Sequence, residues 1–174
     1  TSVLEYPEIE TSLEVMKLGK VAPMVTTKVT SSSITPSSYI STDNMLQNRA
    51  GIELFEGVIS SANMTEYKKG DILVSNIRPY LKKIWLADHD GGCSNDVLVF
   101  RNIHPKLSNE YLYCILSSNT FFEYMMVGKT GTKMPRGNRR AIPNFKVPLL
   151  SPELQSTFVK EILKIEKKYS SIKN

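Results

Sequence analysis

The sequence is poor in the features that mark secreted and membrane proteins. It has two cysteines in 174 residues, Cys93 and Cys114, a density that is too low for a disulfide scaffold and that fits a reducing cytoplasm. No stretch is apolar and long enough to span a bilayer, and the acidic N-terminal stretch does not resemble a signal peptide. We therefore expect a cytoplasmic protein with no membrane partner. Because the chain opens at Thr1 without an initiator Met, we also expect a piece of a longer protein.

Motifs for catalysis and cofactor binding are also missing. The sequence has no GxGxxG or GxxxxGK[ST] nucleotide loop, no GxSxG elbow, and neither the cofactor loop nor the (Asn/Asp)-Pro-Pro-aromatic motif of an adenine methyltransferase. His89 and His104 have no nucleophile and acid nearby, and with the two cysteines they do not make a zinc spacing. The acids in the segment 88–96 are interrupted by glycines, which is typical of a polar turn. We therefore predict a protein that is not an enzyme and holds no cofactor and no metal.

Composition favours one packed domain with a mildly basic surface. Hydrophobic residues make up 41% of the chain, and 22 Lys and Arg against 17 Asp and Glu give a formal net charge of +5. This charge permits a nucleic-acid partner without requiring one, because solvated lysines alone produce such a balance.

The order of local patterns along the chain predicts the fold class. Strand patterns come first and helix patterns later, which favours an α+β fold: a mixed, largely antiparallel sheet with short helices, followed by a long C-terminal helix. The Ser/Thr-rich segment 26–38 is interpreted as a loop or an edge strand, and turns are expected at Lys69–Asp71 and Asp88–Gly92. Strands are predicted at Tyr39–Thr42, Ile52–Ile59, Ile72–Val74, Lys83–Ala87 and Val97–Phe100, and short helices at Asn109–Leu116 and Phe121–Val127.

The C-terminal segment has the clearest helix pattern. Ser151 is a good N-cap and Pro152 a good first helical residue. The apolar residues that follow recur at spacings of a coiled-coil seam, so we expect the helix to dock on a helix outside this domain, either that of a second domain of the same kind or that of a second copy of the chain. The alternative is that the helix packs back on its own sheet. The seam residues are Leu154, Phe158, Ile162, Ile165, Tyr169 and Ile172.

Two basic segments carry the functional signal. The segment Gly128–Lys146 contains six Lys and Arg and no acid, and glycines and prolines interrupt regular structure in it. The segment Arg78–Lys83 joins an aromatic ring to three cations. Each alone is compatible with a solvated loop, but two such segments in one small domain favour DNA, because Lys and Arg neutralise phosphates and Arg, Thr and Asn can bond base edges. The candidate DNA contacts are Asn76, Arg78, Tyr80, Lys82, Lys83, Lys129, Thr130, Thr132, Lys133, Arg136, Asn138, Arg139 and Arg140.

Several blocks of the sequence, in order, resemble the target recognition domains of type I restriction–modification specificity subunits. The segment Lys68–Arg101 resembles their central block, with Gly70-Asp71, Arg78-Pro79-Tyr80 and Gly92-Cys93-Ser94 in matching order. Gly131–Arg136 resembles the Gly-Thr, Lys-Met-Pro-Arg loop of that family, and Pro148–Val159 the start of its spacer helix. The resemblance covers about residues 15 to 170, and it departs at 150–152, where the family often has a double proline.

The resemblance implies a role in DNA recognition. Such subunits carry two recognition domains separated by long helices, and each domain recognises one half of a split DNA target. It implies that residues 1–150 form a DNA target recognition domain and that residues 151–174 begin the spacer helix, in a half subunit or an excised domain. The implied partners are double-stranded DNA and the methyltransferase and restriction subunits. The methyltransferase subunit would flip the target adenine and bind S-adenosylmethionine.

The resemblance also implies a division of labour among the candidate residues. Lys82, Lys83, Lys129 and Lys133 are expected to hold phosphates. The base-edge candidates are Thr132, Arg136, Asn138, Arg139 and Arg140. Because the recognised sequence differs between members of the family, we expect the family-typical residues Lys133, Met134 and Pro135 to serve phosphates or packing.

Two other interpretations stay open. The chain could be the recognition domain of a single-chain restriction–methylation enzyme, in which case methyltransferase motifs would lie upstream. It could instead be a protein-interaction module whose helix is an oligomerisation stalk, with basic loops that are mere surface. A small hydrolase is disfavoured because the sequence has no credible nucleophile–base pair.

Overall fold

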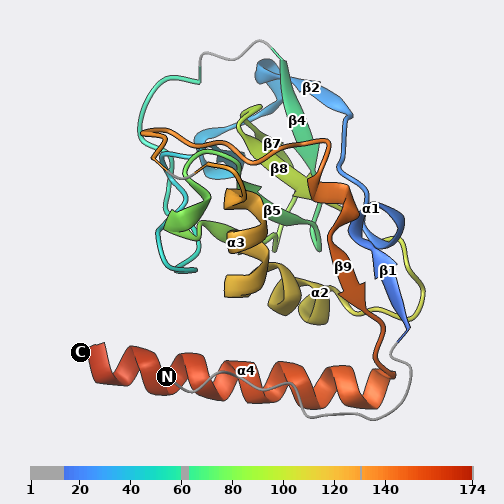
Figure 1. The fold of residues 1–174 in the computed structure, drawn as a ribbon. Coiled ribbons are helices and arrows are strands. Elements are labelled where there is room, and N and C mark those ends of the chain that lie inside the picture. The colour runs from blue at the N-terminus through green and yellow to red at the C-terminus, as the bar shows by residue number, and fades with distance from the viewer. Residues whose placement is uncertain (1–13, 60–62, 130, 174) are drawn as a thin grey trace.

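A computed structural model describes residues 14–59, 63–129 and 131–173, the last five of them without side-chain detail. Figure 1 shows the strands and short helices gathered in one body, with one long helix along its lower end. In chain order the elements are β1 (Val15–Lys17), α1 (Leu18–Val21), β2 (Lys28–Thr30), β3 (Tyr39–Ile40), β4 (Asn63–Tyr67), β5 (Ile72–Ser75), β6 (Ile84–Leu86), β7 (Gly91–Cys93), β8 (Val97–Phe100), α2 (Asn109–Leu116), α3 (Asn119–Met126), β9 (Lys146–Pro148) and α4 (Pro152–Lys173). Short 3-10 turns lie at η1 (Ser31–Ser33), η2 (Pro36–Ser38), η3 (Pro79–Leu81) and η4 (Ile142–Asn144).

The strands of the described residues form three sheets. One pairs β1 with β9, one has the order β2-β4-β7-β3, and one has the order β6-β5-β8. Every pairing is antiparallel except that of β3 with β7. The fold is therefore the mixed, largely antiparallel α+β fold with short helices and a C-terminal helix that the sequence predicts. The Ser/Thr-rich segment contributes β2, which is an edge strand.

The sheet β6-β5-β8 is buried on both faces, and its strands confirm three of the predicted ones. Side chains alternate between the faces of a strand, so Ile72 and Val74 of β5 enter one core, which they share with α2 and α3. Leu73 points to the other core, where it packs with Trp85 of β6. The β-branched and apolar runs of these strands are therefore explained by burial on two sides.

The predicted strand Ile52–Ile59 is wrong. Only Ile52 makes a bridge, with Met45, while Leu54 is 62% and Val58 86% exposed. The strand of this region is β4, whose sequence Asn-Met-Thr-Glu-Tyr has little apolar character and therefore gave no local signal. It forms because β2 and β7 supply hydrogen-bonding edges on either side, which local sequence does not reveal.

The predicted turn Asp88–Gly92 ends two residues early, because Gly91 and Gly92 belong to β7. Glycine is depleted in strands, but here another chain segment approaches the backbone closely. A Cβ on Gly91 would lie 2.1 Å from the Ser38 carbonyl oxygen and 2.4 Å from the Tyr67 hydroxyl oxygen. The hydroxyl of Tyr67 donates to that carbonyl at 2.7 Å. Burial raises the pKa of Tyr67, which keeps this donor protonated.

Serine caps determine where the helices begin. The Ser108 hydroxyl accepts a backbone hydrogen bond at the start of α2, and the helix has the predicted bounds. Ser118 does the same for α3, so this helix begins at Asn119, two residues before the predicted start. Ser151 accepts from the backbone of Leu154 at 3.3 Å, and α4 begins at Pro152 as predicted.

One side of α4 packs back on its own domain. Phe158 meets Tyr111 of α2 with ring centroids 5.6 Å apart. Gln155 is buried, and its amide accepts from the Ser108 backbone at 2.9 Å and donates to the Lys106 and Leu150 carbonyls. The first turns of α4 therefore pack back on their own domain, and they contact α2 where the alternative interpretation expected the sheet.

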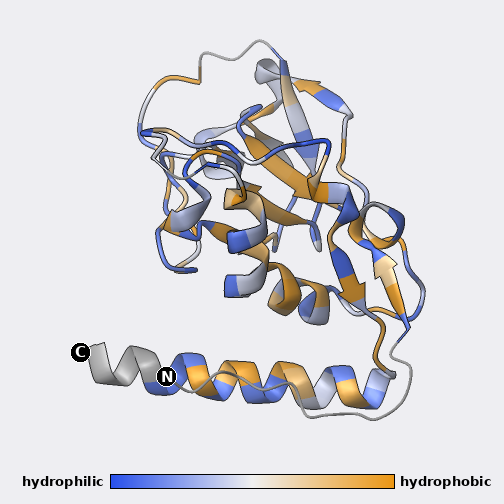
Figure 2. Cartoon of the chain, viewed as in Figure 1, coloured by the Kyte–Doolittle hydropathy of each residue, from blue (hydrophilic) through white to orange (hydrophobic). Residues whose placement is uncertain are grey.

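The rest of the α4 stripe is only partly covered. Ile162 is half-buried, whereas Leu154 and Ile165 are 44% and 45% exposed. The side chains of Tyr169 and Ile172 lie outside the described residues. Figure 2 shows apolar and polar residues alternating around α4. Docking of α4 on a helix outside the domain stays a prediction. In the described part of the chain, no helix is both long and apolar enough to cross a membrane.

An ion pair fixes the turn before β5 to the end of β8. Asp71, which is 2% exposed, accepts from Arg101 Nε at 3.0 Å and from its Nη2 at 2.8 Å, and its other contact is the Lys68 backbone N–H at 2.9 Å. The Asp71 hydrogen bond raises the pKa of Arg101. The forked guanidinium and the carboxylate are therefore matched in geometry.

Asp71→Asn should lower the free energy of unfolding by about 2–3 kcal/mol, because it removes the charge that compensates the partly buried guanidinium. Urea unfolding followed by circular dichroism measures this. Glu56→Gln, at an exposed position, is the matched control and should change stability by less than about 0.5 kcal/mol. Equal effects of the two substitutions would contradict this role for the ion pair.

Candidate nucleic-acid interface

The two basic segments of the sequence meet at the carboxyl end of β5. The Arg78 backbone N–H donates to the Pro135 carbonyl at 2.8 Å, and the Gly137 N–H donates to the Asn76 carbonyl at 3.3 Å. Between these bonds Ile77 and Arg136 form an antiparallel bridge. Segments that are 61 residues apart in sequence at Asn76 and Gly137 therefore form one surface.

The first segment is a tight turn with an unusual backbone. Arg78 and Lys82 flank η3 with φ values of 50° and 54°, in the left-handed region. Non-glycine residues enter this region at a cost, and such residues cluster at functional sites. The Leu81 and Lys82 N–H groups close the turn onto the Arg78 and Pro79 carbonyls at 2.9 and 3.0 Å. The result is a protruding turn that leaves Arg78 exposed and Tyr80 49% exposed.

Two of the predicted contacts in this segment point inward. Asn76 is 4% exposed and its amide nitrogen donates to the Gly137 carbonyl at 3.3 Å. Its Oδ1 is buried without a hydrogen-bond partner among the described residues. The ammonium of Lys83 donates to the Thr42 carbonyl at 2.7 Å. Asn76 therefore lies beneath the surface and supports the loop. The ammonium of Lys83 is bonded to the fold itself, and Lys82 is half-buried.

The second segment presents most of its polar side chains to solvent. Arg136 forms an ion pair with Asp96 at 3.5 Å, and the Arg139 guanidinium donates to the Asn95 carbonyl. The Asn138 side chain accepts from the Arg140 backbone at 3.0 Å and so shapes the loop itself. Lys129 is half-buried, and Thr130 lies outside the described residues. The exposed candidates are Thr132, Lys133, Arg136, Asn138, Arg139 and Arg140.

Two further basic residues bond to residues of this surface, Lys28 through its side chain and Arg49 through its backbone, and no local pattern indicated either. Lys28 of β2 donates to Asn95 Oδ1 at 2.9 Å and to Thr65 Oγ1 at 3.1 Å, which places it near the residue that Arg139 contacts. The backbone N–H of Arg49 donates to the Lys82 carbonyl at 2.8 Å. Both belong to segments without a basic pattern, so only the tertiary structure associates them with the basic segments.

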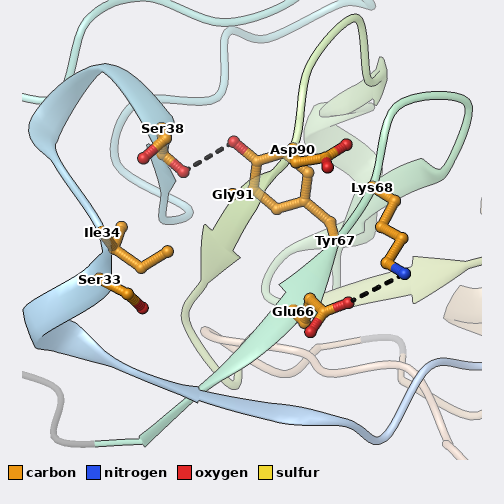
Figure 3. Close-up of a pocket in the computed structure, with 8 residues that line it drawn as sticks. All are labelled: Ser33, Ile34, Ser38, Glu66, Tyr67, Lys68, Asp90 and Gly91. Carbon is orange, nitrogen blue, oxygen red and sulfur yellow. Dashed lines mark hydrogen bonds and ion pairs between the residues drawn. The ribbon is translucent and has the colours of Figure 1, made fainter.

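A separate hollow of about 210 Å³ lies between η1, η2, β4 and β7, and Figure 3 shows its lining. Its polar groups bond to one another: Tyr67 points its hydroxyl at the Ser38 carbonyl, and Lys68 pairs with Glu66 at 3.7 Å. Asp90 accepts from the Lys69 backbone at 2.8 Å. The hollow therefore presents mutually satisfied groups instead of a nucleophile with a base.

The described residues offer little chemistry for catalysis. Cys93 and Cys114 are free and buried. Burial raises the pKa of each to about 12, so neither forms a thiolate near neutral pH. No cluster of three His, Cys, Asp or Glu side chains in the described part of the chain could hold a metal ion. Fold and surface together define a binding module with a basic turn and loop.

Comparison with known proteins agrees with this class. No protein-family model matches the chain. It is 28% identical over 150 residues to the specificity subunit of the type I restriction enzyme EcoDI from Escherichia coli, an alignment that covers 83% of this chain and 32% of the relative. The chain is thus similar in sequence to a type I restriction enzyme specificity subunit, and this similarity confirms the resemblance of the sequence blocks. It spans about a third of the length of this curated relative.

Solved structures show the same fold. The HsdS subunit from Thermoanaerobacter tengcongensis superposes with a TM-score of 0.74 at 21% identity, over 94% of this chain and 44% of that one. A chain from a study of complex assembly and conformational transition of a type I R-M system gives 0.63 at 14% identity, over 97% and 43%. The S subunit from M. genitalium gives 0.51 at 14% identity, over 92% and 41%.

Gly137→Ala should displace the loop, because a Cβ there would lie 2.7 Å from Asn76 Oδ1 and 3.0 Å from the Met125 methyl carbon. We expect a loss of about 1–3 kcal/mol in the free energy of unfolding, the usual effect of overpacking a buried site. Thermal unfolding measures this. Gly131→Asn is the control, since an added Cβ meets nothing within 4 Å and Asn tolerates the left-handed backbone. A smaller loss for Gly137→Ala than for the control would refute the close packing.

Proposed function

We propose that the chain is a DNA target recognition domain that recognises one half of a split sequence for a type I restriction–modification complex in the cytoplasm. One observation carries the proposal: the two basic segments meet on one face of the molecule, and its fold is similar to that of a solved specificity subunit. In this proposal residues 1–150 form the recognition domain and residues 151–174 begin the spacer helix.

The proposed contacts fall into two groups, those to phosphates and those to base edges. Lys82, Lys129 and Lys133 hold phosphates and set the register on the duplex. Arg136, Arg139 and Arg140 can donate in a fork to guanine edges, with Thr132 and Asn138 beside them. Arg78 and Tyr80 extend the surface from the protruding turn. Asn76 and Lys83 act from within, because their polar atoms bond other parts of the fold.

The proposed partners follow from the helix and from the relatives. The E. coli relative is a specificity subunit of a restriction enzyme, and one solved relative comes from an assembled type I system. Leu154 and Ile165 lie on one side of α4 and are both exposed, which gives a partner helix a surface to pack on. Methyltransferase and restriction subunits would join there or nearby, and the methyltransferase subunit would supply the catalysis.

Selection of bound duplexes from a randomised pool tests this function. The pool is selected at moderate salt with the chain alone and again with a methyltransferase subunit present, since a small footprint binds weakly by itself. Enrichment of a short motif in either condition supports sequence recognition. Absence of enrichment in both, with the chain shown to be folded, would refute the proposal and favour a protein-interaction module.

The affinity for the selected duplex should depend steeply on salt. If about six phosphates are neutralised, the log–log slope is about −5, and Lys133→Ala should reduce it by about 0.9. Arg136→Ala should weaken binding by about 10- to 100-fold and relax preference at one base pair, because a forked base contact is lost. Fluorescence anisotropy over a salt series measures both.

The matched control for these substitutions is Lys164→Ala on α4, at a well-exposed position away from the basic segments. It removes the same charge and should leave the affinity and the slope unchanged. An equal loss for Lys164→Ala would mean that net charge alone drives binding, which contradicts the assigned surface.

A further inference from the structure

A short hairpin adjoins the protruding turn. Met45 and Ile52 form its bridge, and the Leu46 N–H donates to the Gly51 carbonyl at 2.8 Å. At its tip Asn48 and Arg49 have φ values of 55° and 63°. Two successive left-handed residues are the pattern of a type I′ turn, which favours Asn-Gly. The sequence has Arg49 where this turn favours glycine, so the backbone of Arg49 is strained. The turn sequence itself does not explain why an arginine stands there.

The tip of this hairpin holds the far end of the turn Arg78–Lys82. The N–H of Asn48 donates to the Leu81 carbonyl at 2.9 Å, and the N–H of Arg49 donates to the Lys82 carbonyl at 2.8 Å. The near end of the turn is held by the Pro135 carbonyl. The protruding turn is therefore fixed at both ends by segments that are distant in sequence.

The side chain of Arg49 anchors the hairpin to the helices. Its Nε donates to the Ser117 carbonyl, and its Nη2 donates to Asn119 Oδ1 at 2.8 Å. Its guanidinium carbon lies 5.6 Å from the centre of the Phe122 ring. These contacts span the junction between α2 and α3, so one half-buried residue joins the helices to the turn. The planar fork of Arg suits this set of partners, whereas a lysine ammonium does not.

We propose that Arg49 is a positioning residue that locks the Arg78–Lys82 turn onto the α2–α3 junction and so sets where Arg78 and Tyr80 meet the duplex. This inference rests on the proposed DNA-recognition function. It assigns Arg49 an indirect role, because its guanidinium donors are directed at the protein. The turn itself also packs on α3, so loss of the Arg49 side chain loosens the end of the turn that the hairpin holds and removes no phosphate contact.

The discriminating variant is Arg49→Gly, which relieves the left-handed backbone and keeps the N–H donor to Lys82 while it removes the anchor. Asn48→Gly is the matched control, since it relieves the same kind of strain at the neighbouring exposed position. Arg49→Lys keeps the charge and loses the fork. Each variant is compared with the wild-type chain for affinity to the selected duplex over a salt series, and for amide hydrogen exchange without DNA.

We expect Arg49→Gly to fold, to bind at least about tenfold more weakly and to keep the salt slope of the wild type. Amides of residues 78–83 should exchange faster in this variant and not in Asn48→Gly, and Arg49→Lys should recover little of the affinity. Unchanged affinity and exchange would overturn the inference. A slope reduced by about 0.9 would also overturn it, because it would show a direct phosphate contact.

Failure of the proposed function has a different signature. If the wild-type chain enriches no motif in the randomised pool, DNA recognition fails, and the exchange of residues 78–83 in the free variants alone decides whether Arg49 positions the turn. If the wild type binds and Arg49→Gly binds equally well, DNA recognition stands and the positioning role fails.

Discussion

Burial of β5 on both faces is the constraint on which the rest of the structure depends. Ile72 and Val74 pack against the helices while Leu73 packs into the second core, so the strand can neither shift nor rotate without exposing one set. Its carboxyl end runs directly into Asn76 and the protruding turn. The position of the turn is therefore fixed by the core, and the loop and the hairpin hold it from two sides by a few backbone hydrogen bonds.

This arrangement separates the scaffold from the surface that meets a ligand. Side chains on irregular segments can change without disturbing the packing of the strands beneath them. The proposed DNA contacts lie on such segments, whereas the residues that support them, such as Asn76 and Gly137, are buried or closely packed.

Sequence alone predicted the elements whose signals are local. β-branched and apolar runs predicted β5 and β8, apolar spacing predicted α2, and Ser151 and Pro152 predicted the start of α4. The two acid-free basic segments were also found without a structure. The prediction failed where contacts between distant segments determine the structure. Ile52–Ile59 is not a strand, and Gly91 lies in β7 because Tyr67 and Ser38 approach its backbone too closely for a side chain. The burial of Asn76 and the reach of Arg49 to Ser117 arise from contacts far apart in the sequence, so no local pattern indicated them.

Amide hydrogen exchange of the chain with and without its selected duplex tests most directly whether the two basic segments act as one DNA-binding surface. The account predicts that residues 77–82 and 131–140 become protected together on binding, while the exposed face of α4 and the hollow beside Tyr67 exchange as before. Protection of only one segment, or protection centred on the hollow, would contradict it.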